Sequence, residues 1–281
     1  MSKADLVFKE TLQRILDEGV SDEEQQVRTV WKDGAPAHTL SVFGVVNRYN
    51  LQEEFPIITL RPTAFYSGLK EILWIYQDKS NNVQLLKDKY NIHWWDAWAN
   101  QDSNLGRAYG YQMRQVHWYG EKVGYMSQID KLIYDLKTNP SSRRLILNLY
   151  NHHDLHDMTL YPCAFMTMFD VREGKLNMTL TQRSSDYLVA GNINATQYAL
   201  LQHMIAQSVG LEVGEFIHYI NNCHIYTRHV DQAKEIIKRE PRPVPKLIID
   251  DTIKHFYRFK PEHFKLEGYN PHPQMKLEVA I

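Results

Sequence analysis

The sequence predicts an α+β fold in a single domain. Helix-type and strand-type segments mix along its 281 residues without regular βαβ alternation, which favours α+β over a doubly wound parallel sheet. No proline- or glycine-rich linker divides the chain. The proline-rich stretch 240–247 comes closest, and the sequence after it is too short for a second domain. We therefore expect residues 1–281 to form one domain.

Five helices are expected where apolar residues recur at helical spacing. Gly19 and Gly210 follow two of them, and prolines lie beyond two others, as is typical of helix ends. Thr63 and Ser127 are expected to be N-caps, because a side-chain hydroxyl can accept a hydrogen bond from a free backbone N–H. The expected helices cover residues 4–18, 63–77, 127–139, 195–209 and 228–239.

The expected strands are rich in β-branched and aromatic residues. Residues 38–50 alternate between apolar and polar side chains, and residues 143–150 and 215–226 are also expected to be strands. Residues 165–183 are typical of a hairpin that turns near Glu173 and Gly174. Strands and helices together predict a sheet with helices packed on it.

Composition excludes several classes of function. Hydrophobic content is 43%, charged content is 23% and formal net charge is −1, so we expect a globular protein with a small-molecule substrate and no primary nucleic-acid partner. Two cysteines form neither a disulfide framework nor a metal motif, and a reduced, cytoplasmic location is expected. The N-terminus lacks an apolar signal core, and no apolar run approaches the ~20 residues that span a bilayer.

Polar residues suited to chemistry gather in the second half of the chain. Cys163 is either a packed core side chain, the commoner state of a cysteine, or a nucleophile whose thiolate a neighbouring arginine would stabilise. Cys223, within an apolar strand, is expected to be buried. The clusters are PSSRR (140–144), YPC (161–163), QRSSD (182–186), GNIN (191–194) and HIY (224–226).

The arginines and Asn194 each allow two interpretations. Arg143, Arg144 and Arg183 either form surface ion pairs or bind a phosphate, because a guanidinium offers two donors to two oxygens. Asn194 either caps a helix or reads an imide edge, such as N3–H and O4 of uracil, since a carboxamide both donates and accepts.

Three further features complete the candidates. His224 and Tyr226 lie two apart on an expected strand and so share one face. Glu71 lies in a mostly apolar helix, where a carboxylate is either paired or an acid with a raised pKa. The C-terminal residues 271–281 end on apolar side chains and form either a frayed terminus or a closing lid.

Together these clusters resemble the thymidylate synthase family almost from end to end. The resemblance implies a large mixed sheet flanked by helices, with the sheet at the interface of a homodimer. It also implies reductive methylation of dUMP to dTMP, with 5,10-methylenetetrahydrofolate as carbon donor and reductant. The motifs that carry it are VRT (27–29), FPIITLR (55–61), KEILWIYQ (70–77), WDAW (95–98), NLGRAYGYQ (104–112), NPSSRR (139–144), YPC, QRSSD, NCHIYTRH (222–229), EPRPVPKL (240–247) and VAI (279–281).

The resemblance assigns roles to the reacting groups. Cys163 matches the thiolate that adds to C6 of the pyrimidine and turns the ring into an enolate. Arg183 matches an arginine near that sulfur and on the phosphate. Glu71 matches the acid that organises water and moves protons, and Tyr109 matches a tyrosine that assists loss of the C5 proton. Asn194 matches the residue that reads N3 and O4, where dCMP hydroxymethylases carry aspartate.

Substrate contacts follow by the same resemblance. Arg143 and Arg144 match a pair that reaches the phosphate of the other subunit, so each site would be shared. The residues that match dUMP ligands are Arg28, Arg143, Arg144, Arg183, Ser184, Ser185, Asp186, Asn194, His224 and Tyr226. Those that match folate contacts are Ala64, Trp95, Asp186, Ala280 and Ile281.

Several positions depart from the family pattern. Ala164 and Ala64 stand where the family usually has histidine, Arg61 replaces a lysine, and residues 190–193 replace a Gly-Leu-Pro-Phe sequence. These departures bear on folate binding and leave the nucleophile in place. The alternatives are a pyrimidine hydroxymethylase on the same fold, a cysteine hydrolase and a nucleic-acid-binding module. Trp95 and the C-terminal VAI favour the synthase over the hydroxymethylase, since both would shield the intermediate from water.

Overall fold

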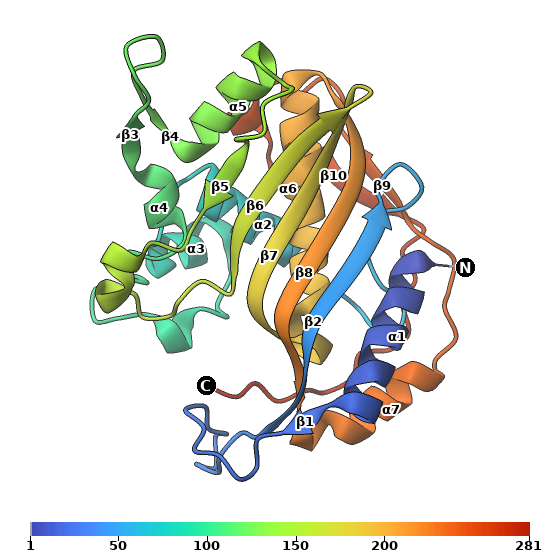
Figure 1. The fold of residues 1–281 in the computed structure, drawn as a ribbon. Coiled ribbons are helices and arrows are strands. Elements are labelled where there is room, and N and C mark those ends of the chain that lie inside the picture. The colour runs from blue at the N-terminus through green and yellow to red at the C-terminus, as the bar shows by residue number, and fades with distance from the viewer. Residues whose placement is uncertain (1) are drawn as a thin grey trace.

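A mixed six-stranded sheet forms the centre of the protein (Figure 1). The computed structural model describes residues 2–281. The strand order is β1-β2-β8-β7-β6-β5, in which β7 and β8 run parallel and the other neighbours antiparallel. The strands are β1 (Val20–Ser21), β2 (Thr39–Asn50), β3 (Val116–Trp118), β4 (Tyr125–Ser127), β5 (Ile146–Asn148), β6 (Ala164–Arg172), β7 (Lys175–Asp186), β8 (Glu212–Tyr226), β9 (Lys246–Ile249) and β10 (Phe264–Glu267).

Helices cover one face of this sheet. In Figure 1, α6 crosses behind β6, β7 and β8, and α1 lies beside β2. The α-helices are α1 (Lys3–Glu18), α2 (Phe65–Tyr76), α3 (Val83–Tyr90), α4 (Gly110–Arg114), α5 (Gln128–Thr138), α6 (Asn192–Val209) and α7 (Val230–Lys238). The shorter helical turns are η1 (Asp96–Trp98), η2 (His152–Asp157), η3 (Tyr187–Gly191, a π-helix), η4 (Thr227–His229), η5 (Phe256–Arg258) and η6 (Pro261–His263).

The main apolar core lies between the sheet and α6. Leu176, Leu180, Phe216 and Ile220 point from β7 and β8 onto this helix and are fully buried. Their alternation with half-buried residues on both strands follows from the two-residue repeat of a strand. Because nearly all sides of α6 are buried, its side chains can form part of a site that lies between this helix and the strands.

The helices leave the opposite face of the sheet uncovered (Figure 1). Phe43 is 76% exposed and Val46 59%. Strand pairing places side chains in rows across this face. One row consists of Val46, Tyr219, Thr181 and Met166, and the next of Arg48, Ile217, Thr179, Met168 and Ile146.

The predicted fold class and main elements agree with the structure. Ser127 caps α5 by accepting from the Asp130 N–H, and Gly210 ends α6 at φ 76°, a conformation that glycine adopts without steric cost. The hairpin of β6 and β7 turns at Glu173 and Gly174 as expected. The strand expected over residues 143–150 is shorter, since β5 spans only Ile146–Asn148.

Two capping interpretations were wrong. Ala64, not Thr63, occupies the N-cap position of α2, because the Thr63 hydroxyl donates to the Asn192 carboxamide at 2.7 Å instead. Asn194 is not an N-cap either, since α6 already begins at Asn192. Both side chains are used for tertiary contacts, which local sequence patterns do not reveal.

Candidate active site

The predicted site residues meet at one end of the sheet. Because β7 and β8 are parallel, Asp186, the last residue of β7, lies beside His224, two residues before the end of β8. The start of β6 comes to the same end, since Ala164 pairs with Gln182, and Thr39 at the start of β2 pairs with Tyr226. The C-terminus lies at this end too (Figure 1).

Arg183 holds the segment that carries Cys163. Its Nη2 lies 3.4 Å from the Cys163 Sγ and donates to the Tyr161 carbonyl at 2.7 Å, and its Nε donates to the Pro162 carbonyl at 3.1 Å. The Arg183 backbone N–H also donates to the Cys163 carbonyl at 2.9 Å. The guanidinium is therefore fixed beside the sulfur before any substrate binds.

The Cys163 thiol is half-buried and is not part of a disulfide. Burial raises the pKa of this thiol, while the charges of Arg183 and Arg28 oppose the rise. The arginines therefore act in the predicted direction, but burial outweighs them. At neutral pH the free protein carries mainly the thiol form. Cys223, in contrast, is fully buried, as expected for a core cysteine.

Tyr109 lies against the Cys163 backbone in an unusual conformation. Its hydroxyl accepts from the Cys163 N–H at 3.3 Å, and its ring packs edge-on against Trp95. Its φ of 50° and ψ of −112° are strained for a residue with a Cβ. Gly110 makes this turn possible, because a Cβ there would lie 2.0 Å from the Ser80 carbonyl oxygen.

Glu71 is buried on α2 and surrounded by donors. Its carboxylate accepts from the indole N–H groups of Trp94, at 3.1 Å, and Trp95, and from the Gln197 carboxamide. Burial raises the pKa of Glu71, and these three hydrogen bonds oppose the rise. Glu71 therefore combines the two expected alternatives, since its carboxylate is hydrogen-bonded and its pKa is raised.

Asn194 lies between two buried glutamines that sequence reasoning missed. Gln182 on β7 donates to its Oδ1 at 3.1 Å, and its Nδ2 donates to the Gln197 Oε1 at 3.1 Å. The Gln182 Oε1 in turn lies 2.7 Å from Nε2 of His218. Asn194 and Gln197 are three residues apart, so their shared helix face was a detectable signal.

The C-terminus pairs with the segment that carries Arg28. Val30 donates to the Ile281 carbonyl at 2.8 Å, and the Ile281 N–H donates to the Val30 carbonyl at 3.0 Å. Ala280 is buried in a small cluster with Trp31 and Ala37. The last residues are therefore docked over this end of the sheet rather than frayed.

His224 and Tyr226 do share one face, with ring centroids 5.6 Å apart. Burial lowers the pKa of His224 to about 4, so the imidazole is neutral at pH 7 and can offer one donor and one acceptor. Arg28 is exposed, and its charge acts on both Tyr226 and Cys163. Ser184 is half-buried, whereas the neighbouring Ser185 is buried, with no partner for its hydroxyl among residues 2–281.

Arg143 and Arg144 lie at the opposite end of the sheet. Leu145 accepts a backbone hydrogen bond from Phe169, six residues along β6 from Cys163, a separation of roughly 20 Å for a strand. Both arginines are exposed. Within one chain they cannot contact a ligand held at Cys163.

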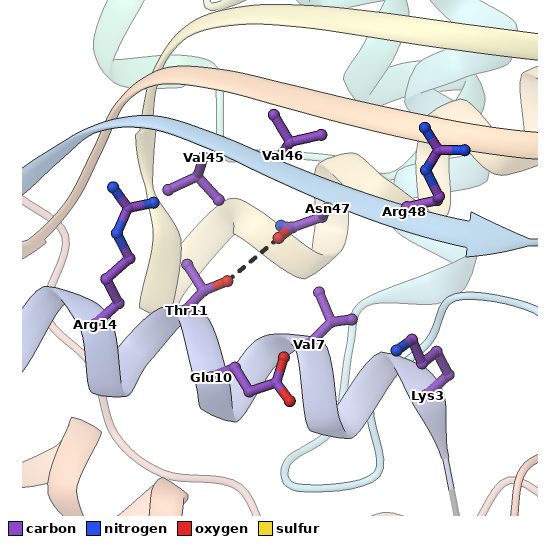
Figure 2. A pocket seen from close by; sticks show the side chains of 9 residues that line it. All are labelled: Lys3, Val7, Glu10, Thr11, Arg14, Val45, Val46, Asn47 and Arg48. Carbon is purple, nitrogen blue, oxygen red and sulfur yellow. Dashed lines mark hydrogen bonds between the residues drawn. The ribbon is translucent and has the colours of Figure 1, made fainter.

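Two surface grooves lie away from Cys163. One, of about 360 Å³, runs between α1 and β2, where Thr11 donates to Asn47 at 3.2 Å (Figure 2). The other, of about 450 Å³, is lined by polar residues that include Arg107 and Arg114. In the part of the chain that the structure describes, no group of three His, Cys, Asp or Glu residues is placed to hold a metal, and no helix is long and apolar enough to cross a membrane.

Comparison with known proteins agrees with the geometry. The family model described as thymidylate synthase matches residues 6–281. A thymidylate synthase of Bacillus licheniformis is 45% identical over 286 residues, covering 100% of both chains. The chain belongs to the thymidylate synthase family. A thymidylate synthase of Streptococcus pneumoniae (strain 70585) is also 45% identical, over 293 residues.

A solved structure supports the same assignment. The thermostable thymidylate synthase A from Bacillus subtilis is 40% identical, covers 99% of each chain and has a TM-score of 0.95. The predicted family, fold, methyltransferase activity and use of methylenetetrahydrofolate as cosubstrate are confirmed. The hydroxymethylase alternative is not favoured.

The departures from the thymidylate synthase pattern form their own contacts. The Arg61 guanidinium is buried and donates to the carbonyls of Leu188 and Val189 at 2.6 and 2.7 Å. Asn192 accepts from the Ile58 N–H at 3.1 Å and donates to the Pro56 carbonyl at 3.0 Å. Arg61 thus links the loop before α2 to η3. Asn192, in the altered stretch 190–193, links the same loop to the start of α6.

Asp186 lies at the junction of β7 and η3. Burial raises its pKa to about 7, while the Val189 N–H, at 3.3 Å from Oδ1, and the Arg61 charge oppose the rise. Near neutral pH this carboxyl exists in both protonation states. It can therefore both donate to and accept from a pterin-like ring edge. The residues at this end fit a folate in their chemistry, because Asp186 offers a polar anchor and Trp95 an aromatic wall.

Proposed function

We propose that Cys163 is the nucleophile for reductive methylation of dUMP to dTMP. The observation that carries this proposal is the Cys163 thiol held 3.4 Å from a fixed arginine, Arg183. Addition of the sulfur to C6 of the pyrimidine makes C5 nucleophilic. The thiol needs to lose its proton as it attacks, and the two arginine charges favour the anion.

Glu71 and Tyr109 are proposed to handle protons near the ring. A carboxyl whose pKa burial raises is better suited to give and take a proton than an exposed carboxylate. Tyr109, with its hydroxyl at the Cys163 backbone, is placed to assist loss of the C5 proton. Both lie against Trp95, whose ring excludes water from this side.

Asn194 is proposed to read N3 and O4 of uracil, and His224 with Tyr226 to hold the ribose 3′-hydroxyl. Asn194 is half-buried beside fully buried glutamines, so one side of its carboxamide stays open. Arg28, Arg183, Ser184 and Ser185 are proposed for the dUMP side of the site as well, with Asp186 between base and folate. Exposed Arg28 and fixed Arg183 supply two positive charges for the phosphate.

The folate supplies the one-carbon unit and the reducing hydride. Asp186, Trp95, Ala64, Ala280 and Ile281 are proposed to bind it. Ala64 is exposed at the start of α2, and Ala280 and Ile281 belong to the docked C-terminus. Docking of this terminus would also keep water from the reacting atoms.

We propose a homodimer in which the uncovered sheet faces pack together. The exposed apolar side chains on that face, among them Phe43 at 76% exposure and Val46 at 59%, are unusual on the surface of a monomer. A two-fold axis would allow Arg143 and Arg144, which cannot reach their own Cys163, to serve the partner's phosphate site.

We also propose that residues 1–281 act as a single domain. Its unpaired cysteines suit the cytoplasm.

A product assay tests the proposed function. Purified protein, dUMP and methylenetetrahydrofolate should yield dTMP, with the rise in absorbance that accompanies dihydrofolate. Formation of 5-hydroxymethyl-dUMP without dihydrofolate would overturn the proposal in favour of a hydroxymethylase.

A further inference from the structure

A continuous chain of side-chain hydrogen bonds passes through Asn194. It joins β8, β7, α6 and α2, and each member except Asn194 is buried. Its members, in order, are His218, Gln182, Asn194, Gln197 and Glu71. The two residues that flank Asn194 determine which way its carboxamide points, because they bond its oxygen and its nitrogen separately.

The orientation of Gln197 is fixed by the Gly68 carbonyl, which can only accept, and by Glu71 in its ionised form. Its Nε2 faces the Glu71 carboxylate and lies 3.4 Å from the Gly68 carbonyl. A carboxylate and a carbonyl both need a donor, so the amide nitrogen of Gln197 has to be on this side. Its Oε1 therefore faces Asn194 and can bond only the Asn194 Nδ2.

The orientation of Gln182 is fixed independently. Its Nε2 donates to the Ser184 carbonyl at 2.9 Å as well as to Asn194 Oδ1. Its Oε1 therefore faces Nε2 of His218, which has to donate. Burial lowers the pKa of His218 to about 3, so the ring is neutral and its single N–H is on Nε2. Every hydrogen bond thus runs in one direction, from His218 to Glu71.

The fixed orientations of Gln182 and Gln197 both require the same orientation of the Asn194 carboxamide. Its Oδ1 keeps one free lone pair and its Nδ2 one free N–H. That remaining pair of groups matches uracil, which offers N3–H and O4. Cytosine offers the reverse pattern, an N3 acceptor and an N4 donor, and a turned carboxamide would place two N–H groups of Asn194 and Gln182 face to face.

We propose that Gln197 and His218 are positioning residues that hold Asn194 in the orientation specific for a uracil edge. The inference rests on the proposed role of Asn194 in reading the base. Neither residue would touch the substrate. Gly68 supports the arrangement, because a Cβ there would lie 3.0 Å from the Gln197 Cγ.

The test measures dissociation constants for dUMP and dCMP by calorimetry in a Cys163→Ser background. Gln197→Met and His218→Leu should each lower the preference for dUMP roughly tenfold, the effect of losing one orienting hydrogen bond. His218→Gln, which retains an N–H donor at this reach, should restore most of the preference. Should Gln197→Met not fold, Gly68→Ala shifts the same side chain by a few tenths of an ångström and should lower the preference to a smaller extent.

Matched controls come from the same helix. Gln202 donates to the Leu176 and Glu215 carbonyls, and His203 is a neutral histidine whose Nε2 has no partner among residues 2–281. Gln202→Met and His203→Leu should leave the preference within about twofold of the parent protein.

Asn194→Asp separates the two possible failures. If this variant shifts binding toward dCMP while Gln197→Met, His218→Leu and Gly68→Ala leave the preference intact, the positioning role is wrong and the proposed base contact stands. If Asn194→Asp leaves the preference for dUMP over dCMP unchanged, Asn194 does not read the base. The proposed base contact and the proposed positioning role then both fail.

Discussion

The two ends of the proposed dUMP site are built differently. On the base side, Glu71, Gln197, Asn194 and Gln182 come from one chain and satisfy one another's hydrogen bonds in a buried network. On the phosphate side, Arg28 is exposed, and Arg143 and Arg144 lie at the far end of the sheet.

The base side of the site therefore provides specificity, whereas the phosphate side provides positive charge. A buried network of fixed dipoles discriminates between bases because the wrong partner leaves polar groups unpaired. Exposed arginines gain attraction for a phosphate without selecting a base, and their effect depends on salt and on a second subunit. Arg183 serves both sides of the site, because its guanidinium carries charge for the phosphate and is fixed beside the nucleophile.

The largest expected effect is that of Cys163→Ser. Turnover should fall by at least about 10³-fold, because a hydroxyl is a far weaker nucleophile than a thiolate near neutral pH. Binding of dUMP should persist, since the base network and the arginines remain. Steady-state kinetics and calorimetry measure the two quantities, and a fully active variant would disprove the role of Cys163.

Mixing of subunits tests the shared phosphate site. Arg143→Ala should lose about 10²-fold of activity through loss of a charge-assisted contact. Refolding it with equal Cys163→Ser subunits should restore roughly a quarter of wild-type activity, because half of the dimers are mixed and each holds one complete site. An inactive mixture with verified heterodimers would count against an arginine supplied by the partner.

Asp186 predicts a pH dependence of stability. Its folded pKa of about 7 lies above the unfolded value near 3.8, so between these values the folded protein binds more protons. Its stabilising contribution is complete below about pH 4 and is lost as pH rises to about 7. Relative to Asp186→Asn, the parent should lose about 2–3 kcal/mol of unfolding free energy across this range, allowing for partial exposure.

Denaturant unfolding at several pH values, at one protein concentration, measures this difference. Parallel stability profiles for the parent and Asp186→Asn would show that burial does not raise the pKa of Asp186. Glu71 titrates in both proteins and so cancels in the comparison.

The smallest expected effect is that of salt. Raising ionic strength from about 0.05 to 0.5 M should weaken dUMP binding several-fold, because exposed arginine charges are screened. The ratio of dUMP to dCMP affinity should stay within about twofold, since the buried network is shielded from ions. A matching loss of preference would mean that the base side is as exposed to solvent as the phosphate side.

The sequence predicted residues that lie on regular elements better than residues held by tertiary contacts. The helical spacing in α1 and the turn at Glu173 and Gly174 are local patterns, and both were confirmed. Thr63 satisfies the cap pattern equally well, yet its hydroxyl bonds Asn192 instead. The short hairpin of β3 and β4 and the pair β9 and β10 had no pattern strong enough to predict them.

The sequence by itself determined the family, the α+β class and the identity of the candidate nucleophile, Cys163, because motif order and periodicity are properties of the chain. The tertiary structure alone decided how Asn194 is oriented, that burial outweighs the arginines at the thiol, and that Arg143 and Arg144 lie far from their own Cys163. The physical reason is that hydrogen-bond direction, desolvation and distance depend on groups that are remote in sequence and meet only on folding.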